Sequence, residues 1–283
     1  MDIAEDKAGN RAGEIAMDSP SCTPSCTPSC NSVVSSAALP VAIESLPLYS
    51  ADEAFRGCYK AVVVAPHPDD ETLGCGGAIA LLRQRNIPVH VLIMSDGTQS
   101  HPRSKQYPAD RLRALRESEA IAALRLLHGL PSEVTFFRWP DTAVPHPGDQ
   151  HFARAVAQCD RALQYHAPNL IFLPWQHDQH CDHQASYQIV HHCLNSWPMP
   201  PRQLAYAVWG SRTAGLPALP TGETGWRLDI STVKALKYQA AMAHKSQTTC
   251  LIQDDLSGFR LTPTMLNNLI QPWETYLEIL GQS

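Results

Sequence analysis

The chain has 283 residues, of which 44% are hydrophobic and 17% charged, and its formal net charge is −5. This composition is ordinary for a globular protein, and the slightly acidic balance offers no basic surface, so we expect no nucleic-acid partner. No apolar run approaches the about 18 residues of a membrane-spanning helix, and the N-terminus lacks the apolar stretch of a secretion signal. We therefore expect a cytoplasmic protein with no transmembrane segment, of undetermined oligomeric state.

Residues 1–45 are predicted to be a disordered, low-complexity tail. Cys22, Cys26 and Cys30 recur within a Ser-Cys-Thr-Pro repeat, and a segment rich in Ser, Thr and Pro cannot build a packed core. A metal or cluster site on these cysteines is the alternative, which we consider weaker. The nine cysteines of the chain are expected to be reduced thiols, because cytoplasmic proteins rarely keep disulfides.

From about residue 55 onward, apolar β-branched runs alternate with helical patterns. Strands are predicted at 59–65, 89–94, 134–137, 169–173 and 203–209, and helices over about 70–85, 110–127, 152–165 and 183–194. Such alternation is typical of βαβ units with right-handed crossovers. We predict one α/β domain over 55–283, with a Rossmann-like layered fold and a mostly parallel sheet. Ligands of such sheets bind at the carboxyl ends of the strands.

Two clusters of ligand-capable side chains directly follow predicted strands. The first is Pro-His-Pro-Asp-Asp-Glu at 66–71, and the second is His-Asp-Gln-His-Cys-Asp-His at 177–183. Alone, the first could only cap a helix and the second could be a solvated loop. Because parallel strands end at the same edge of a sheet, the two clusters could converge on one ion. Together they favour a metal site.

The chemistry of a hydrolytic zinc site suggests how these residues divide the work. Such a site uses three protein ligands and leaves one position for water, whose pKa the metal lowers to about 7. A separate carboxylate must take the proton, and adjacent residues on a turn point in different directions. We predict His67, Asp70 and His183 as metal ligands and Asp69 as the general base. The ligand types fit Zn²⁺ and also another divalent ion such as Fe²⁺.

The same residues carry a resemblance to a known family. The stretch Ala-Pro-His-Pro-Asp-Asp-Glu-Thr-Leu-Gly-Cys-Gly-Gly at 65–77, with His180-x-Asp182-His183, closely resembles the LmbE-like de-N-acetylases of the PIG-L superfamily. The resemblance covers roughly residues 57–280. Further matching motifs are Ser-Asp-Gly at 95–97, Arg116-x-x-Glu119, Trp-Pro-Asp at 139–141, and His-Lys-Ser-Gln at 244–247 preceded by Lys237.

The resemblance implies a Rossmann-like enzyme that uses one zinc ion to hydrolyse an N-acyl group, typically of an N-acetylglucosaminyl compound. It gives the metal and the base to the same four residues as the argument above. It further implies that His180 stabilises the oxyanion and that Asp182 orients the imidazole of His180. A carboxylate partner would raise the pKa of His180 and favour its imidazolium form.

Three further residues are candidate substrate contacts. Asp96 and Asp141 follow strands at the expected active edge and could bind sugar hydroxyls, although each could equally cap a turn. Arg116 is the third candidate, with a structural pair to Glu119 on the same helix as the alternative.

We therefore expect a zinc-dependent hydrolase that removes the acetyl group from an N-acetylglucosamine-type sugar, glycolipid or glycoconjugate, with zinc-bound water as nucleophile and acetate as product. One alternative is a zinc amidase acting on another N-acyl compound or a thiol-sugar conjugate. A noncatalytic sugar-binding protein is another, but it would lack a ligand or the base, and every motif position is present. A dinucleotide enzyme is disfavoured because Gly74, Gly76 and Gly77 lie within a predicted helix, where close packing explains them.

Overall fold

The structure is a computed structural model that describes residues 41–209, 218–219 and 223–279. The predicted tail lies outside these ranges except for its last five residues, which form the short strand β1 and the 3₁₀ turn η1. In the described ranges, no helix is both long and apolar enough to cross a membrane, and no disulfide joins the cysteines.

The described elements agree closely with the sequence prediction as far as residue 206. The strands are β1 Val41–Ala42, β2 Leu48–Tyr49, β3 Ala61–Ala65, β4 Val89–Ser95, β5 Val134–Trp139, β6 Leu170–Pro174, β7 Arg202–Tyr206, β8 Ala218–Leu219, β9 Gly225–Asp229 and β10 Trp273–Ile279. The helices are α1 Ala51–Ala54, α2 Asp70–Gln84, α3 Ala109–Leu126, α4 Phe152–His166, α5 Cys181–Leu194, α6 Lys234–Ala243, α7 Lys245–Thr248 and α8 Pro263–Leu269. The 3₁₀ turns are η1 Ile43–Ser45, η2 Thr98–Ser100 and η3 Pro131–Glu133.

Within the described residues, eight strands form one sheet in the order β2-β9-β10-β7-β6-β3-β4-β5. Strands β7, β6, β3, β4 and β5 are mutually parallel, whereas β10 runs antiparallel to both β7 and β9. The predicted α/β fold with a mostly parallel sheet is therefore confirmed. The chain proceeds from β3 outward to β4 and β5, and then crosses back to β6 and β7. The strand order thus reverses between β3 and β6, which is where open sheets of this kind bind ligands.

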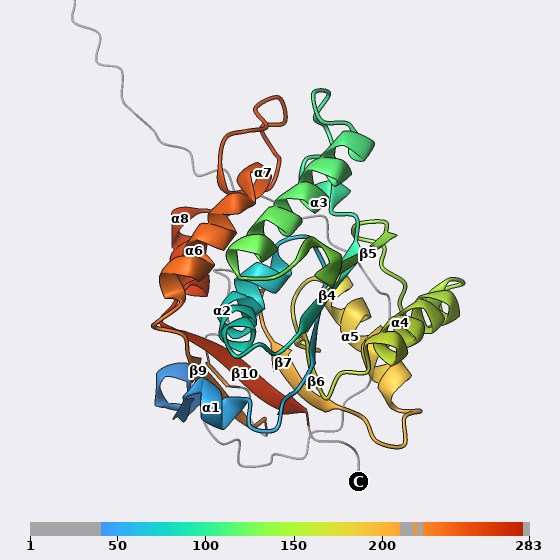
Figure 1. Ribbon diagram of the computed structural model, residues 1–283. Helices are drawn as coiled ribbons and strands as arrows, with labels where there is room; N and C mark the ends of the chain where they lie inside the picture. The colour runs from blue at the N-terminus through green and yellow to red at the C-terminus, as the bar shows by residue number, and fades with distance from the viewer. Residues whose placement is uncertain (1–40, 210–217, 220–222, 280–283) are drawn as a thin grey trace, which may run out of the picture. The chain divides into compact units, whose positions relative to one another are not determined.

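Alternate residues of the central strands enter two separate cores, as the period of two in a strand requires. Ala61 and Val63 of β3 pack with α2, α3 and α6, while Val62 and Val64 pack with α4 and α5. Figure 1 shows these two helix groups on opposite sides of the strands. Burial on both faces explains why these strands read as continuous apolar runs.

Glycines let α2 lie close to the sheet. A Cβ atom at Gly74 would come within 2.2 Å of the Tyr206 ring, and one at Gly77 within 2.4 Å of Ile230. The prediction that these glycines serve close helix packing is confirmed. Close packing against Tyr206 and Ile230 fixes the position of α2. The first polar cluster lies at the start of this helix.

Candidate metal centre and active site

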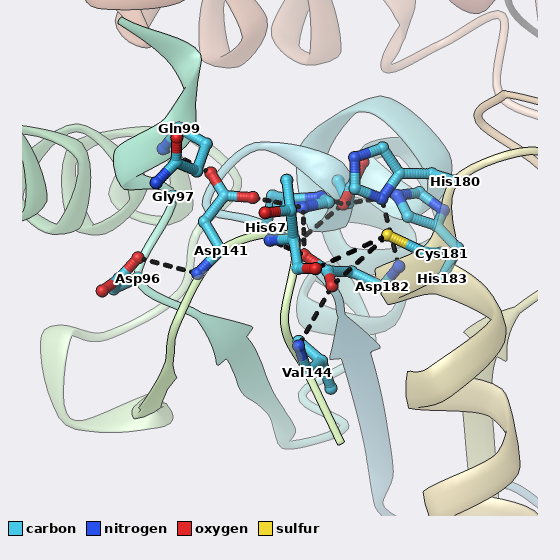
Figure 2. A network of polar contacts seen from close by, with 12 residues as sticks. His67, Asp96, Gly97, Gln99, Asp141, Val144, His180, Cys181, Asp182 and His183 are labelled. Carbon is cyan, nitrogen blue, oxygen red and sulfur yellow. Dashed lines mark hydrogen bonds and ion pairs between the residues drawn. The ribbon is translucent and has the colours of Figure 1, made fainter. Parts of the chain in front are cut away.

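The two polar clusters meet because β3 and β6 are neighbours in the sheet. The turn at 66–69 leads from β3 into α2, and residues 175–180 lead from β6 into α5. The ring centroid of His67 lies 4.6 Å from that of His180 and 5.4 Å from that of His183. Figure 2 shows the three imidazoles gathered beside the start of α5. The predicted convergence of the clusters is therefore confirmed.

Asp70 joins the two histidines that were predicted to share a metal with it. Its Oδ2 lies 3.0 Å from Nδ1 of His67 and 3.2 Å from Nε2 of His183. All three side chains are buried. Burial raises the pKa of Asp70, but the two histidines outweigh it and hold that pKa well below its usual value. The carboxylate is therefore ionised, the form in which it binds metals.

The donors of this cluster fit a divalent metal ion. Ring nitrogens of His67, His180 and His183 all lie within 4.8 Å of one another. Both ring nitrogens of His183 are buried without a hydrogen bond, although carboxylate oxygens lie 3.2 and 3.3 Å away. Buried nitrogens are rarely left without a partner, and imidazole with carboxylate is a common zinc donor set.

Further carboxylates face the other ring nitrogens of the two histidines. Asp178 Oδ2 lies 3.3 Å from Nδ1 of His183, and Asp182 Oδ2 lies 3.0 Å from Nε2 of His67. Asp141 Oδ1 is 3.3 Å from the same nitrogen of His67. Carboxylates in this position orient metal-binding histidines and raise their basicity. Sequence reasoning gave no role to Asp178, although it lies within the second cluster.

The electrostatics of the two histidines follow from these neighbours. Burial lowers the pKa of His183, yet Asp70 and Asp178 outweigh it and raise that pKa to about 9. Burial likewise lowers the pKa of His67, which the surrounding carboxylates raise well above its ordinary value, Asp141 most strongly. The pocket is thus strongly anionic and attracts cations.

Asp69 is buried beside the metal cluster and is held by Arg116. Arg116 Nη2 lies 3.1 Å from Asp69 Oδ2 and also donates to the Pro68 carbonyl at 3.0 Å, while Nη1 donates to the Gly97 carbonyl at 2.8 Å. Burial raises the pKa of Asp69 to about 6, even though Arg116 acts to lower it. A carboxylate with this pKa can accept and release a proton near neutral pH.

His180 departs from the sequence expectation in its charge. Its Nδ1 accepts the backbone N–H of Asp182 at 3.2 Å, which places the proton of the neutral ring on Nε2. Burial and the neighbouring histidines His67 and His183 lower the pKa of His180 to about 4. The predicted rise in this pKa is therefore wrong, because desolvation and positive neighbours outweigh the nearby carboxylates. A neutral ring with its N–H on Nε2 can still donate a hydrogen bond.

The carboxylate of Asp182 also points elsewhere than expected. It binds His67 and accepts the backbone N–H groups of Thr142 at 2.8 Å and Val144 at 3.1 Å. The hydrogen bond between Asp182 and the His180 ring is made by the backbone N–H of Asp182 and not by its carboxylate. Figure 2 shows the bond from Val144 and the approach to His67. The carboxylate thus orients His67, which corrects the expectation that it orients His180.

The three residues predicted to contact substrate make contacts within the protein, and their role in substrate binding stays a prediction. Asp96 Oδ1 accepts from the Thr98 amide and hydroxyl and from the Asp141 amide. Asp141 accepts the Gln99 amide at 2.8 Å besides contacting His67. Asp96 therefore closes a turn that fixes Asp141, the alternative left open by the sequence, and Arg116 fixes Asp69.

Comparisons with known proteins match the part of the chain that carries these residues. Residues 62–194 match the PIG-L family, described as GlcNAc-PI de-N-acetylase. The probable N-acetyl-alpha-D-glucosaminyl L-malate deacetylase 2 of Bacillus subtilis is 29% identical over 199 residues, covering 68% of this chain and 85% of that protein. The diacetylchitobiose deacetylase of Thermococcus kodakarensis is 23% identical over 210 residues, covering 70% and 74%.

Solved structures agree with the fold. The N,N'-diacetylchitobiose deacetylase of Pyrococcus horikoshii superposes with a TM-score of 0.60 at 19% identity, covering 80% of this chain and 85% of that one. At this identity the likeness concerns the fold alone. With the motifs at 65–77 and 180–183 in place, residues 62–194 of this chain match the PIG-L (LmbE-like) family domain.

Proposed function

We propose that this protein is a zinc-dependent hydrolase that removes the acetyl group from an N-acetylglucosamine-type sugar, glycolipid or glycoconjugate. The observation that carries the proposal is one buried cluster in which Asp70 lies between His67 and His183, with Asp69 beside it. The names of the relatives, deacetylases of N-acetylglucosaminyl malate and of diacetylchitobiose, support the substrate class.

In this proposal His67, Asp70 and His183 hold the metal ion. A bound divalent metal lowers the pKa of water and polarises a carbonyl oxygen. His180 is left out of the ligand set because its Nδ1 already accepts the Asp182 amide, so its Nε2 carries a proton in the neutral ring. The donor set does not distinguish zinc from other divalent ions, and zinc is favoured because imidazole and carboxylate suit it.

Asp69 acts as general base and then as general acid. It accepts a proton from the attacking water and returns it to the nitrogen of the amine that leaves. Its pKa of about 6 suits both steps, and Arg116 keeps the carboxylate in one orientation. Water and amide are thereby converted to acetate and free amine with no other reactant.

His180 donates the Nε2 hydrogen to the oxygen of the tetrahedral intermediate. Neutral imidazole serves as this donor, as is the case for other enzymes in which the local field keeps a histidine uncharged. Asp141 and Asp182 both approach Nε2 of His67 and hold its ring in place.

A cytoplasmic location stays a prediction.

The test is acetate release from a panel of N-acetylglucosamine derivatives that differ in the group at the anomeric carbon, using protein of measured metal content. Acetate release that a chelator abolishes and zinc restores is the expected result. One metal ion per chain without acetate from any compound would contradict the proposed deacetylase activity and point to other amides as substrates. Protein that binds no metal under any condition would contradict the proposal.

A further inference from the structure

A second buried polar cluster lies behind Asp69 and has no part in the chemistry described above. It consists of Glu71 and Thr72 in the first turn of α2 and of His244, which joins α6 to α7 about 170 residues later in the chain. All three side chains are buried. His244 Nε2 lies 3.4 Å from Glu71 Oε1 and 3.3 Å from Thr72 Oγ1.

This cluster contacts the backbone of Asp69. Glu71 Oε2 accepts the Asp69 N–H at 3.0 Å, and the other oxygen of Glu71 accepts the Thr72 hydroxyl at 2.8 Å. The Asp69 backbone has φ 153°, a region that side-chain-bearing residues rarely adopt. Such a conformation is strained and persists only where the surroundings enforce it. The Glu71 carboxylate is part of what enforces it.

Glu71 in turn needs a cationic or strongly donating partner. A carboxylate that is 1% exposed is costly to bury unless charges and donors around it compensate. Among the hydrogen bonds and ion pairs of Glu71 with described residues, the Asp69 amide and the Thr72 hydroxyl are neutral, and the His244 ring is the one group that can carry a positive charge. His244 therefore decides how firmly Glu71 is held against the Asp69 amide.

We propose that His244 is a positioning residue for the general base, acting through Glu71 on the backbone of Asp69. Arg116 contacts the side chain of Asp69, while Glu71 contacts its backbone amide, so the base is held at two points. The proposal rests on the proposed function, in which Asp69 is the base. It gives the α6–α7 corner, which carries the His-Lys-Ser-Gln motif at 244–247 and follows residues 62–194 of the family-model match, an influence on turnover.

The same corner offers a matched control. Ser246 is also buried and gives its amide and hydroxyl to Glu119 of α3, at 2.9 and 2.6 Å. Neither residue contacts Asp69. Replacing Ser246 by Ala removes a buried hydrogen bond at the same corner, so it reports the cost of loosening the corner without disturbing Glu71.

The experiment compares kcat and KM for acetate release by His244→Ala, His244→Gln and Ser246→Ala, each with one metal ion per chain. We expect His244→Ala to lower kcat by about 10- to 100-fold with little change in KM, as losses of outer supporting residues do. His244→Gln, which keeps an N–H donor toward Glu71, should recover part of kcat, and Ser246→Ala should keep kcat while lowering the melting temperature. Equal losses of kcat in His244→Ala and Ser246→Ala would overturn the proposal.

A double-mutant cycle tests the route through Glu71. In a Glu71→Gln background, His244→Gln should change kcat little, because the carboxylate that links it to Asp69 is already gone. Effects that simply multiply would mean that His244 acts independently of Glu71.

Amide hydrogen exchange separates this proposal from the proposed function. Exchange of the Asp69 amide should be faster in His244→Gln than in wild type, while amides farther along α2 keep their rates. If wild type released no acetate from any compound, the proposed function would fail, and this measurement alone would decide whether His244 restrains Asp69. An unchanged exchange rate of the Asp69 amide would overturn the inference.

Discussion

Two of the buried charged clusters in the described part of the chain differ in how completely their hydrogen-bonding capacity is used. Under α2, Glu274 of β10 accepts two donors on each oxygen: Lys237 Nζ and the Gly77 amide on Oε1, and the Tyr276 hydroxyl and the Ala78 amide on Oε2. This carboxylate is saturated, as expected of a buried charge that serves stability.

The candidate metal centre is built differently. His183 has both ring nitrogens buried without a hydrogen bond, and two carboxylates, Asp141 and Asp182, approach the same nitrogen of His67. In this cluster the carboxylate oxygens and imidazole nitrogens that could accept a hydrogen bond therefore outnumber the N–H groups that could donate one. A buried cluster with unused ligand atoms is poised for a cation, whereas a saturated one is structural.

The largest effect should come from removing a ligand at the metal centre. His183→Ala should lose the metal ion and lower kcat by about 10³-fold or more, because the charge stabilisation that a metal supplies is worth several kcal/mol. The melting temperature of the metal-free protein should also fall, because Asp70 and Asp178 lose the buried cation that compensates their charges. Metal analysis and calorimetry check both parts, and stoichiometric metal in the variant would contradict the ligand assignment.

In the saturated region around Glu274, a substitution should lower stability and leave metal content and kcat unchanged. Lys237→Met leaves Glu274 as a buried charge without its cation, which should cost about 3–5 kcal/mol of unfolding free energy. Metal content and kcat per folded molecule should be unchanged. Denaturant unfolding is the measurement, with Lys234→Met as control on the exposed face of the same helix. A loss of kcat larger than the loss of folded protein would contradict a purely structural role for Lys237 and Glu274.

An intermediate effect is expected for the carboxylate behind His183. Asp178→Asn keeps the size of the side chain, but it no longer raises the basicity of His183. Its single oxygen can accept either the His180 amide or the amides of Val208 and Trp209, which bind different oxygens of Asp178. Metal affinity should fall by about 10- to 100-fold. Competition with a chromophoric chelator measures this, and an unchanged affinity would show that Asp178 has only a structural role.

The smallest effect concerns a histidine buried away from both regions. His90 stacks on His166 and bonds to Thr135, and burial together with His166 lowers its pKa from 6.5 to about 4. In the unfolded chain, His90 becomes protonated below about pH 6.5. In the folded chain it stays neutral until the pH falls to about 4. Stability should therefore fall as pH decreases through this window, by up to about 1.4 kcal/mol per pH unit.

His90→Gln removes the titrating group while retaining a donor for Thr135. The difference in unfolding free energy between wild type and variant should shift with pH between 6.5 and 4 and be constant above pH 7. A pH-independent difference would mean that His90 titrates equally in both states.

Much of this could be predicted from the sequence, for identifiable reasons. Buried parallel strands read as apolar runs such as Ala61–Ala65, and parallel strands end at one edge, so the approach of His67 to His183 followed from the pattern. The elements after residue 209 were not predicted, because β9 and β10 are antiparallel strands of alternating burial and α7 is only one turn long.

The direction of the side chains at the site was beyond sequence reasoning. Spacing put Asp182 beside His180, yet its carboxylate turns to His67 because the amides of Thr142 and Val144 bind it from another loop. The pKa of His180 depends on burial and on two neighbouring histidines, which only the fold brings together. Asp96 and Arg116 likewise take their roles from tertiary contacts.

The most direct test of the central claim is the turnover of Asp69→Asn with its metal content measured in the same sample. The substituted amide side chain would keep the size of the carboxylate but could not accept the proton. The account predicts one metal ion per chain and a kcat for acetate release lower by about 10²- to 10⁴-fold. Turnover close to wild type with the metal still bound would contradict the assignment of Asp69 as the base.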